Sequence, residues 1–361
     1  MTYLDYQATT PLAPEALAAM LPWLESQHAN PHSPHREGRR AKAAVEVARD
    51  QVAALLPSGG RIAFTSGATE ALNWAIKGTT GQIVTLATEH AAVLDTVAAE
   101  AARGRPVTIL PVGTHGLIDP DAARAAILPG TGLVAAMLVN NEIGVIQPIA
   151  ALADIAHEAG ALMLVDAVQG YGRIPIPDSV DLVAISAHKI HGPKGIGALW
   201  IRDGVDLAPL MHGGGQEALG RSGTLSPALC AGFGVAAHLM ADRKDQDAAH
   251  IDRLWSLALD RLGPGWTVNG ATDHRYHGNL NVRREGLDVN RLMSDLRDIA
   301  FSAGSACASG SGRSSHVLRA IGLTETQARS SIRLGFGRYT TETDLRDAVD
   351  AIAAAAKAQW P

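Results

Sequence analysis

The feature that most constrains the fold of this chain is an alternation of short apolar segments with alanine-rich helical patterns. The apolar segments lie at residues 61–64, 82–86, 133–139, 161–165, 181–185 and 198–201. Helical patterns follow several of them, at residues 69–77, 91–103 and 149–158. Strands that are apolar along their whole length and alternate with helices are typical of a parallel sheet covered on both faces. The sequence therefore predicts an α/β fold with a mainly parallel sheet.

The last third of the chain has a different pattern. An apolar helical pattern over residues 227–240 runs into the charged stretch 241–247, which we expect to begin a long helix into a second domain. Beyond it, expected strands alternate with expected helices, at 278–282, 289–296, 332–334 and 344–355. The 361 residues also exceed the roughly 250–300 that a single core usually holds. We predict a large domain over 13–243 and a smaller α+β domain formed by 1–12 and 244–361.

Composition and charge exclude several classes of function. A net charge of −5 argues against nucleic acid as the main ligand. No apolar run approaches the roughly 20 residues of a membrane helix, and the first residues lack the basic and apolar regions of a signal peptide. The two cysteines, Cys230 and Cys307, cannot build a disulfide framework, which favours a reducing compartment. We therefore expect a cytoplasmic protein that binds neither membranes nor nucleic acid.

Two polar residues directly follow apolar segments and point to one cofactor. Asp166 closes the segment 161–165, and Lys189 comes shortly after the segment 181–185. A lysine amine can form a Schiff base with the aldehyde of pyridoxal phosphate (PLP), and an aspartate can pair with the protonated pyridine nitrogen of that cofactor. The alternatives are a turn cap for Asp166 and a solvated surface residue for Lys189, and Lys194 in the same loop competes for the lysine role. The pair predicts PLP as the cofactor.

A phosphate site is expected near the same residues. Residues 65–70 lie between a strand and a helix, where backbone N–H groups and the Thr69 hydroxyl favour an anion, although an ordinary helix cap has the same sequence signature. Ser186 and His188 are available for the same phosphate. His90, which also follows a strand, could stack on the cofactor ring and move protons, or be a polar loop residue.

The two cysteines differ in their surroundings. Cys307 lies in a stretch of glycine, serine and alanine, which leaves a thiol exposed and favours a reactive residue. Cys230 lies on an apolar helical pattern and is expected in the core. The histidines within residues 28–35 match no zinc-binding spacing, so no metal site is expected.

With these residues in place, the chain resembles the cysteine desulfurases of the NifS/IscS type, in the first group of that branch of the class V aminotransferases. The resemblance covers nearly the whole chain and rests on specific segments: 4–11, 30–38, 66–73, 140–144, 213–215, 221–224, 304–310 and 330–333. It implies the PLP-dependent transferase type I fold. Where this family often has Glu-Pro after the cysteine loop, this chain has Arg313 and Ser314, and Ala187 and Ala218 replace a frequent glycine and arginine.

The resemblance also implies roles for individual residues. Those expected to hold the cofactor are Lys189 as the Schiff base, His90 on the pyridine ring, Asp166 on the ring nitrogen, Gln169 on the ring hydroxyl, and Ala68, Thr69, Ser186 and His188 on the phosphate. Thr224 would reach the phosphate of a neighbouring subunit, which implies a homodimer. Asn141 and Arg333 would bind the substrate carboxylate.

The implied activity is the conversion of L-cysteine to L-alanine. Lys189, His90 and Cys307 would be the catalytic residues, and Cys307 would carry the sulfur as a persulfide to an acceptor protein, such as an iron–sulfur scaffold or a sulfur carrier. The product would serve iron–sulfur cluster or thio-cofactor biosynthesis. The alternatives are a selenocysteine lyase, another class V PLP enzyme, and a degenerate homologue that acts as a structural partner in cluster assembly.

Overall fold

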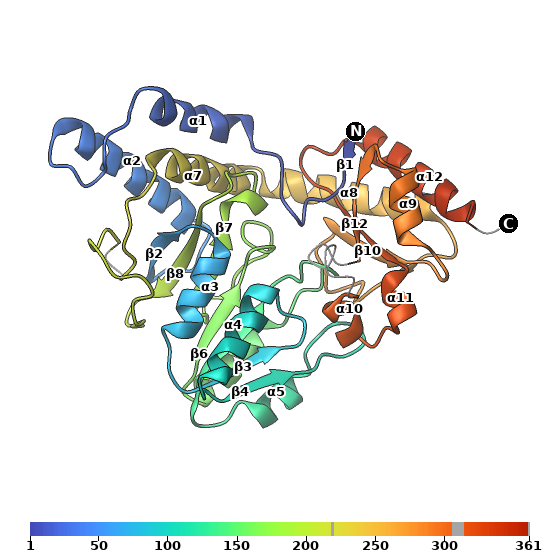
Figure 1. Ribbon diagram of the computed structural model, residues 1–361, viewed down its shortest axis with the longest axis horizontal. Coiled ribbons are helices and arrows are strands. Elements are labelled where there is room, and N and C mark those ends of the chain that lie inside the picture. Colours follow the sequence, from blue (N-terminus) through green and yellow to red (C-terminus); the bar gives the residue numbers. More distant parts are fainter. Residues whose placement is uncertain (218–219, 305–313, 360–361) are drawn as a thin grey trace.

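The structure is a computed structural model that describes residues 1–217, 220–304 and 314–359. Its larger part is built on a seven-stranded sheet, and a smaller part holds a four-stranded sheet with helices around it (Figure 1). The chain crosses from the first part to the second along α7 (Pro227–Asp242) and α8 (Lys244–Leu262), as the charged stretch after residue 240 predicts. No helix in the described part of the chain is long and apolar enough to cross a membrane.

The seven-stranded sheet confirms the predicted α/β fold. Its order is β2-β8-β7-β6-β5-β3-β4. The strands are β2 (Gly60–Thr65), β3 (Gln82–Leu86), β4 (Val107–Leu110), β5 (Thr131–Met137), β6 (Leu162–Asp166), β7 (Leu182–Ser186) and β8 (Gly197–Arg202). Neighbouring residues of one strand enter different cores: Ile83 packs on one face of the sheet, and Val84 packs on the other. Because both faces are buried, each strand is apolar throughout.

The strand β8 is an exception to the parallel arrangement. It pairs antiparallel with both β2 and β7, while the other neighbours in the sheet are parallel. The link from β7 to β8, residues 187–196, contains only one short 3₁₀ turn. A parallel return needs a crossover of about a dozen residues or more, usually a helix, so the short link sends β8 back in the opposite direction.

Helices cover the two faces of this sheet. They are α1 (Pro14–Glu25), α2 (Arg36–Ala53), α3 (Ala68–Lys77), α4 (Ala91–Ala102), α5 (Pro120–Ala126) and α6 (Ile149–Glu158), together with α7. Apolar residues of α1, α2, α6 and α7 share one core, whereas those of α3 and α4 share the core on the opposite face. Because α3 directly follows β2, which runs parallel to β7, it starts at the edge of the sheet where the parallel strands end.

The smaller part has its own apolar core. Its antiparallel sheet has the order β12-β13-β10-β9, with β9 (Thr267–Val268), β10 (Asn279–Arg283), β12 (Ser302–Ala303) and β13 (Ser331–Gly335). Its helices are α9 (Val289–Asp295), α10 (His316–Ala320), α11 (Glu325–Arg329) and α12 (Glu342–Lys357). At the N-terminus, β1 (Thr2–Tyr3) pairs with β11 (Ile299–Ala300), and Leu4 is buried in this core. Residues 2–4 thus pack on the smaller part, whereas Thr10 donates a hydrogen bond to the His188 carbonyl oxygen of the larger part. The assignment of residues 1–12 to the small domain stays a prediction.

Candidate active site

A cavity of ≈ 600 Å³ lies where the parallel strands end, between the two parts of the molecule. The residues predicted from the sequence that line it are Ala68, Thr69, His90, Asn141, Asp166, Gln169, Ser186, His188, Lys189 and Arg333. Carboxyl ends of parallel strands meet at one edge of a sheet, which is where open α/β sheets bind ligands. Thr224 does not line this cavity, and Cys307, Arg313 and Ala218 lie outside the described residues.

The cavity contains two lysines in different surroundings. Lys189 is half-buried at the end of the 3₁₀ turn after β7, and its Nζ donates hydrogen bonds to the carbonyl oxygens of Gln7 and Ala8, the latter at 2.8 Å. Lys194 is exposed. A Schiff-base lysine is usually a partly desolvated one, so this difference favours Lys189 over Lys194.

Asp166 and His90 form the electrostatic centre of the cavity. Asp166 is 4% exposed, and its Oδ1 accepts a hydrogen bond from the Val168 N–H at 3.0 Å. Burial raises its pKa, while the Val168 N–H and the charges of His90 and Lys189 oppose the rise. Burial also lowers the pKa of His90. The His90 Nδ1 accepts a hydrogen bond from the Ala92 N–H at 3.0 Å, which leaves Nε2 as the protonated nitrogen of the neutral ring.

The start of α3 offers an open anion site. No side chain caps this helix, and a Cβ built on Gly67 would meet no atom within 4 Å. Ala68 and Thr69, in the first turn of the helix, line the cavity together with Ser186 and His188, and the N–H groups of a first helical turn have no partner within the helix. Burial lowers the pKa of His188 to about 4, and the charges of Lys189 and Lys194 act in the same direction, so His188 is neutral at pH 7.

An ion pair links this helix start to the segment that carries Thr224. Arg221 Nε and Glu70 Oε1 lie 2.8 Å apart, and each side chain is 13% exposed. Burial alone would raise the pKa of Glu70, but hydrogen bonds from Arg221 and from the Ser66 N–H lower it. Glu70 is thus held as an anion, and Arg221 holds the 221–224 turn beside α3.

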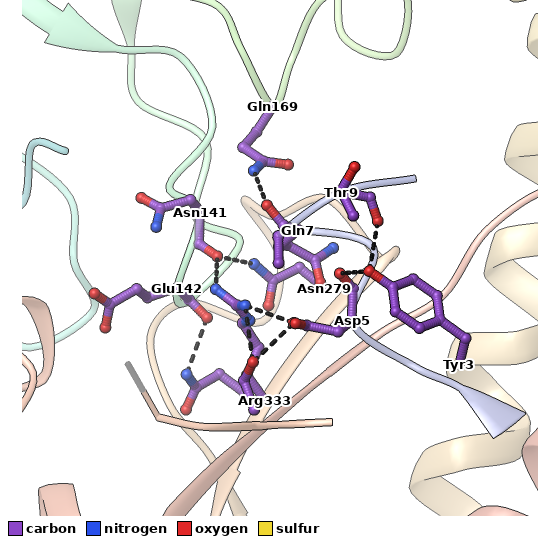
Figure 2. Close-up of polar contacts among 12 residues, drawn as sticks. Tyr3, Asp5, Gln7, Thr9, Asn141, Glu142, Gln169, Asn279 and Arg333 are labelled. Atoms are coloured by element: carbon purple, nitrogen blue, oxygen red, sulfur yellow. Dashed lines mark hydrogen bonds and ion pairs between the residues drawn. The ribbon is translucent and has the colours of Figure 1, made fainter. Parts of the chain in front are cut away.

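Arg333 is almost fully buried, with 1% exposure, and is already paired (Figure 2). Its Nη2 donates to Asp5 Oδ1 at 2.8 Å, and its Nη1 donates to the Asn141 carbonyl oxygen at 3.0 Å. The Arg333 Nε and the Asn141 Oδ1 are buried and have no hydrogen-bond partner in the described chain. Buried polar atoms without partners are uncommon, and these two lie at a cavity lined by both residues.

Sequence reasoning assigned no role to the N-terminal segment, which proves to be part of the site. The Gln7 carbonyl oxygen accepts hydrogen bonds from Lys189 and, at 3.0 Å, from Gln169 Nε2, and Asp5 is the counter-ion of Arg333 (Figure 2). These contacts join residues more than 160 positions apart in the sequence. No local pattern reports such contacts, so only the motif 4–11 could have drawn attention to this segment.

The residues present fit PLP. The cavity offers uncapped N–H groups for a phosphate, a buried carboxyl group for a protonated ring nitrogen, and a half-buried amine for an aldehyde. Asn141 and Arg333, which also line the cavity, each have a polar atom without a partner in the described chain. The anionic phosphate of such a cofactor would meet the positive start of α3, and its cationic ring would meet the carboxyl group of Asp166.

Known proteins agree with this arrangement. The family description "Aminotransferase class-V" matches residues 2–347. The chain is 43% identical to the cysteine desulfurase IscS of Rickettsia bellii over 97% of this chain and 90% of that protein. The NifS-like protein of Rickettsia africae matches with a TM-score of 0.90 and 30% identity over 98% of this chain and 99% of that one. SspA in complex with cysteine matches with a TM-score of 0.83 and 34% identity over 94% of this chain and 100% of that one. Matches of this extent show that the chain belongs to the class V aminotransferase family, on its cysteine desulfurase branch.

Proposed function

We propose that this chain is a PLP-dependent cysteine desulfurase, which converts L-cysteine to L-alanine and carries the sulfur on Cys307. The observation that carries the proposal is the convergence of Lys189, Asp166, His90 and Arg333, from four separate segments, on one cavity. The names of the IscS relatives support it, as does a structural neighbour that holds cysteine. The same convergence argues against a degenerate structural homologue.

Each part of the cavity would hold one part of the cofactor. PLP, when bound, supplies an electron-withdrawing ring that makes the Cα proton of an attached amino acid acidic. The N–H groups at Ala68 and Thr69, with Ser186 and His188, would bind the phosphate, and Lys189 would hold the cofactor covalently. Asp166 would bind the ring nitrogen, because a buried carboxylate is stabilised by an opposite charge. Gln169 Nε2 donates one of its two hydrogens to the Gln7 carbonyl oxygen, and the other would donate to the ring hydroxyl of the cofactor.

The remaining residues would bind the substrate and move protons. Arg333 would orient the carboxylate of L-cysteine, with the unpartnered Nε and the amide of Asn141 as additional contacts. The Lys189 amine would also be placed to take the Cα proton of the substrate. His90 is neutral through burial and carries a proton on Nε2, so it would be a proton donor during the sulfur transfer, and Nε2 would take up a proton only after giving that one away.

The sulfur transfer would take place at the segment that carries Cys307. On one side this segment follows β12, where Ser302 pairs with Arg333 of β13. On the other side, His316 Nε2 lies 2.9 Å from the Glu89 carbonyl oxygen, next to His90. The Cys307 thiolate would attack the substrate sulfur. An S–S bond forms, the Cβ–S bond breaks, and Cβ takes a proton, so that alanine leaves and a persulfide remains.

The proposed partners follow from the same reasoning. A homodimer would place the 221–224 turn, which Arg221 holds beside α3, against the phosphate of the partner subunit. An acceptor protein, an iron–sulfur scaffold or a sulfur carrier, would take the persulfide sulfur. Sedimentation of the holoenzyme at micromolar concentration tests the dimer, and a fully active monomer would contradict it.

The activity is tested by incubating the holoenzyme with L-cysteine. With a thiol reductant, alanine and sulfide should form in equal amounts over many turnovers. Without a reductant, alanine should stop near one equivalent per subunit, and mass spectrometry should find one added sulfur on the Cys307 peptide. Absence of alanine, or added sulfur only on Cys230, would overturn the proposal.

A further inference from the structure

A second cavity, of ≈ 270 Å³, lies behind the candidate active site, where α8 crosses between the two parts of the molecule. Gln7 and Gln169 line both cavities and form the wall between them. The mechanism proposed above uses none of the other residues of the second cavity. Its position between two domains is one in which small-molecule sites are common.

The second cavity carries an excess of positive charge. Four cationic side chains line it, Arg173, Lys244, Arg275 and Arg338, against the two carboxyl groups of Asp247 and Asp252. Asp252 is exposed, and its Oδ1 lies 2.7 Å from His277 Nδ1. Asp247 pairs with Arg338, whereas the other two arginines that line the cavity, Arg173 and Arg275, form no ion pair with it in the described chain. A ligand with a negative charge would therefore be favoured.

Arg338 also has an unused donor. Its side chain is 2% exposed, and its Nε and Nη2 both donate to Asp247 Oδ2, at 2.9 and 2.6 Å. Its Nη1 is buried and has no hydrogen-bond partner in the described chain. A buried donor without an acceptor is destabilising, and more so when the group is charged, so an acceptor placed here would be bound strongly.

The rest of the wall is apolar or neutral. Tyr276, Phe336 and Ile251 line the cavity, and Ile251 and Phe336 are buried. The pKa of His191 is lowered to about 3, mainly by burial and further by the charges of Arg338 and Arg173. The hydrogen bond to the Pro11 carbonyl group acts in the opposite direction and raises it. His191 is therefore an uncharged aromatic wall. The volume is below the roughly 300–1,000 Å³ of drug-sized pockets, which suits a ligand of about one ring.

We propose that this cavity is a second ligand site, which takes a small aromatic or branched monocarboxylate. The carboxylate accepts a hydrogen bond from Arg338 Nη1, with Lys244 nearby at the rim, and the apolar body packs against Tyr276 and Phe336. The site is separate from the substrate site and does not depend on the proposed activity.

The probe for this site is 4-fluorobenzoate, whose ¹⁹F relaxation reports its binding to the holoenzyme. Arg338→Lys keeps a charge beside Asp247 but removes Nη1, and it should weaken binding about tenfold, the loss of one charged hydrogen bond. Ala248 is exposed and lines the cavity, so Ala248→Trp should close its mouth and abolish binding. Ala249→Trp, at an exposed position that does not line the cavity, is the matched control and should bind as the wild type does.

A carboxylate could also bind at Arg333, so Arg333→Lys separates the two sites. Binding that persists in Arg333→Lys and falls in Arg338→Lys and Ala248→Trp supports the second site. The proposal is overturned if Arg333→Lys abolishes binding, if Ala248→Trp and Ala249→Trp bind equally well, or if the wild type shows no binding at about 10 mM, where even millimolar affinity would be detected. The tryptophan pair decides the matter even if Arg338→Lys fails to fold.

Discussion

Replacing Glu89 by glutamine should make the stability of this protein less dependent on pH. Glu89 is 1% exposed between β3 and α4, its Oε1 accepts a hydrogen bond from the Met137 N–H at 2.9 Å, and its Oε2 has no partner in the described chain. Burial raises its pKa well above the ordinary value of 4.5. The Met137 hydrogen bond opposes the rise, and the charge of Asp166 adds to it. We expect Glu89 to stay protonated in the fold at pH values where the unfolded chain ionises it.

The sign and size of the effect follow from proton linkage. Above pH 4.5 the folded wild type holds a proton at Glu89 that the unfolded chain releases, so stability falls as the pH rises. The slope is about 1.4 kcal/mol per pH unit while the group remains protonated in the fold. Glutamine cannot titrate and keeps an acceptor for the Met137 N–H. The advantage of Glu89→Gln over the wild type should therefore grow as the pH rises above 4.5, by up to about 1.4 kcal/mol per pH unit.

Urea unfolding of the holoenzymes at pH 5, 6 and 7 measures this difference. Glu89→Ala is the second variant. It also cannot titrate, but it leaves the Met137 N–H without an acceptor, so it should lie below Glu89→Gln by roughly 1–3 kcal/mol or more at every pH. A difference between Glu89→Gln and wild type that does not change with pH would show that the acid is ionised in the fold, and the reasoning would be wrong. A neutral Glu89 also spares Asp166 a second negative neighbour, so Glu89→Gln should keep its activity.

Four further outcomes are expected. Lys189→Ala should lose the cofactor's absorbance band and all alanine formation, while the control Lys194→Ala should keep both; the reverse result would reassign the lysine. Cys307→Ser should bind cofactor and L-cysteine but form less than about 1% of the wild-type alanine, because a hydroxyl group does not take up sulfur as a thiolate does. Cys230 is 0% exposed and burial raises its pKa to about 12, so Cys230→Ser should stay active and alkylating reagents should modify it slowly. Ser315→Ala removes the cap of α10 and the hydrogen bond that Ser315 donates to the buried Glu142 carboxyl group, so it should lower stability by at least about 0.5–2 kcal/mol, measured by urea unfolding, with Ser314→Ala as the control that leaves both contacts in place.

Much of the fold could be predicted from the sequence because the burial of each strand and helix requires a recognisable pattern of apolar residues in its own segment. The apolar run 82–86 coincides with β3, and the helical pattern 149–158 coincides with α6. Strands buried on both faces need apolar residues at every position, which makes them visible in the sequence. The reversed direction of β8 was not visible in this way, because its apolar run is the same in either direction and the length of the preceding link decides.

Part of the candidate site could likewise be predicted from local sequence patterns. Asp166, His90 and Lys189 follow strands of one parallel sheet, so the strand pattern by itself places them at one edge and predicts a shared site. The sequence also determined the family, through short motifs that need no tertiary contact to be recognised.

Other features depend on the tertiary structure alone. The ion pair between Asp5 and Arg333 joins positions 328 apart, and the second cavity gathers charges from both domains and α8. The burial of Arg338 Nη1 without a partner in the described chain is also visible only in the tertiary structure. A polar residue in a sequence looks the same whether its partner is water, a distant carboxylate or a ligand. Only folding removes the water, and the groups that replace it come from whichever segments the topology brings together.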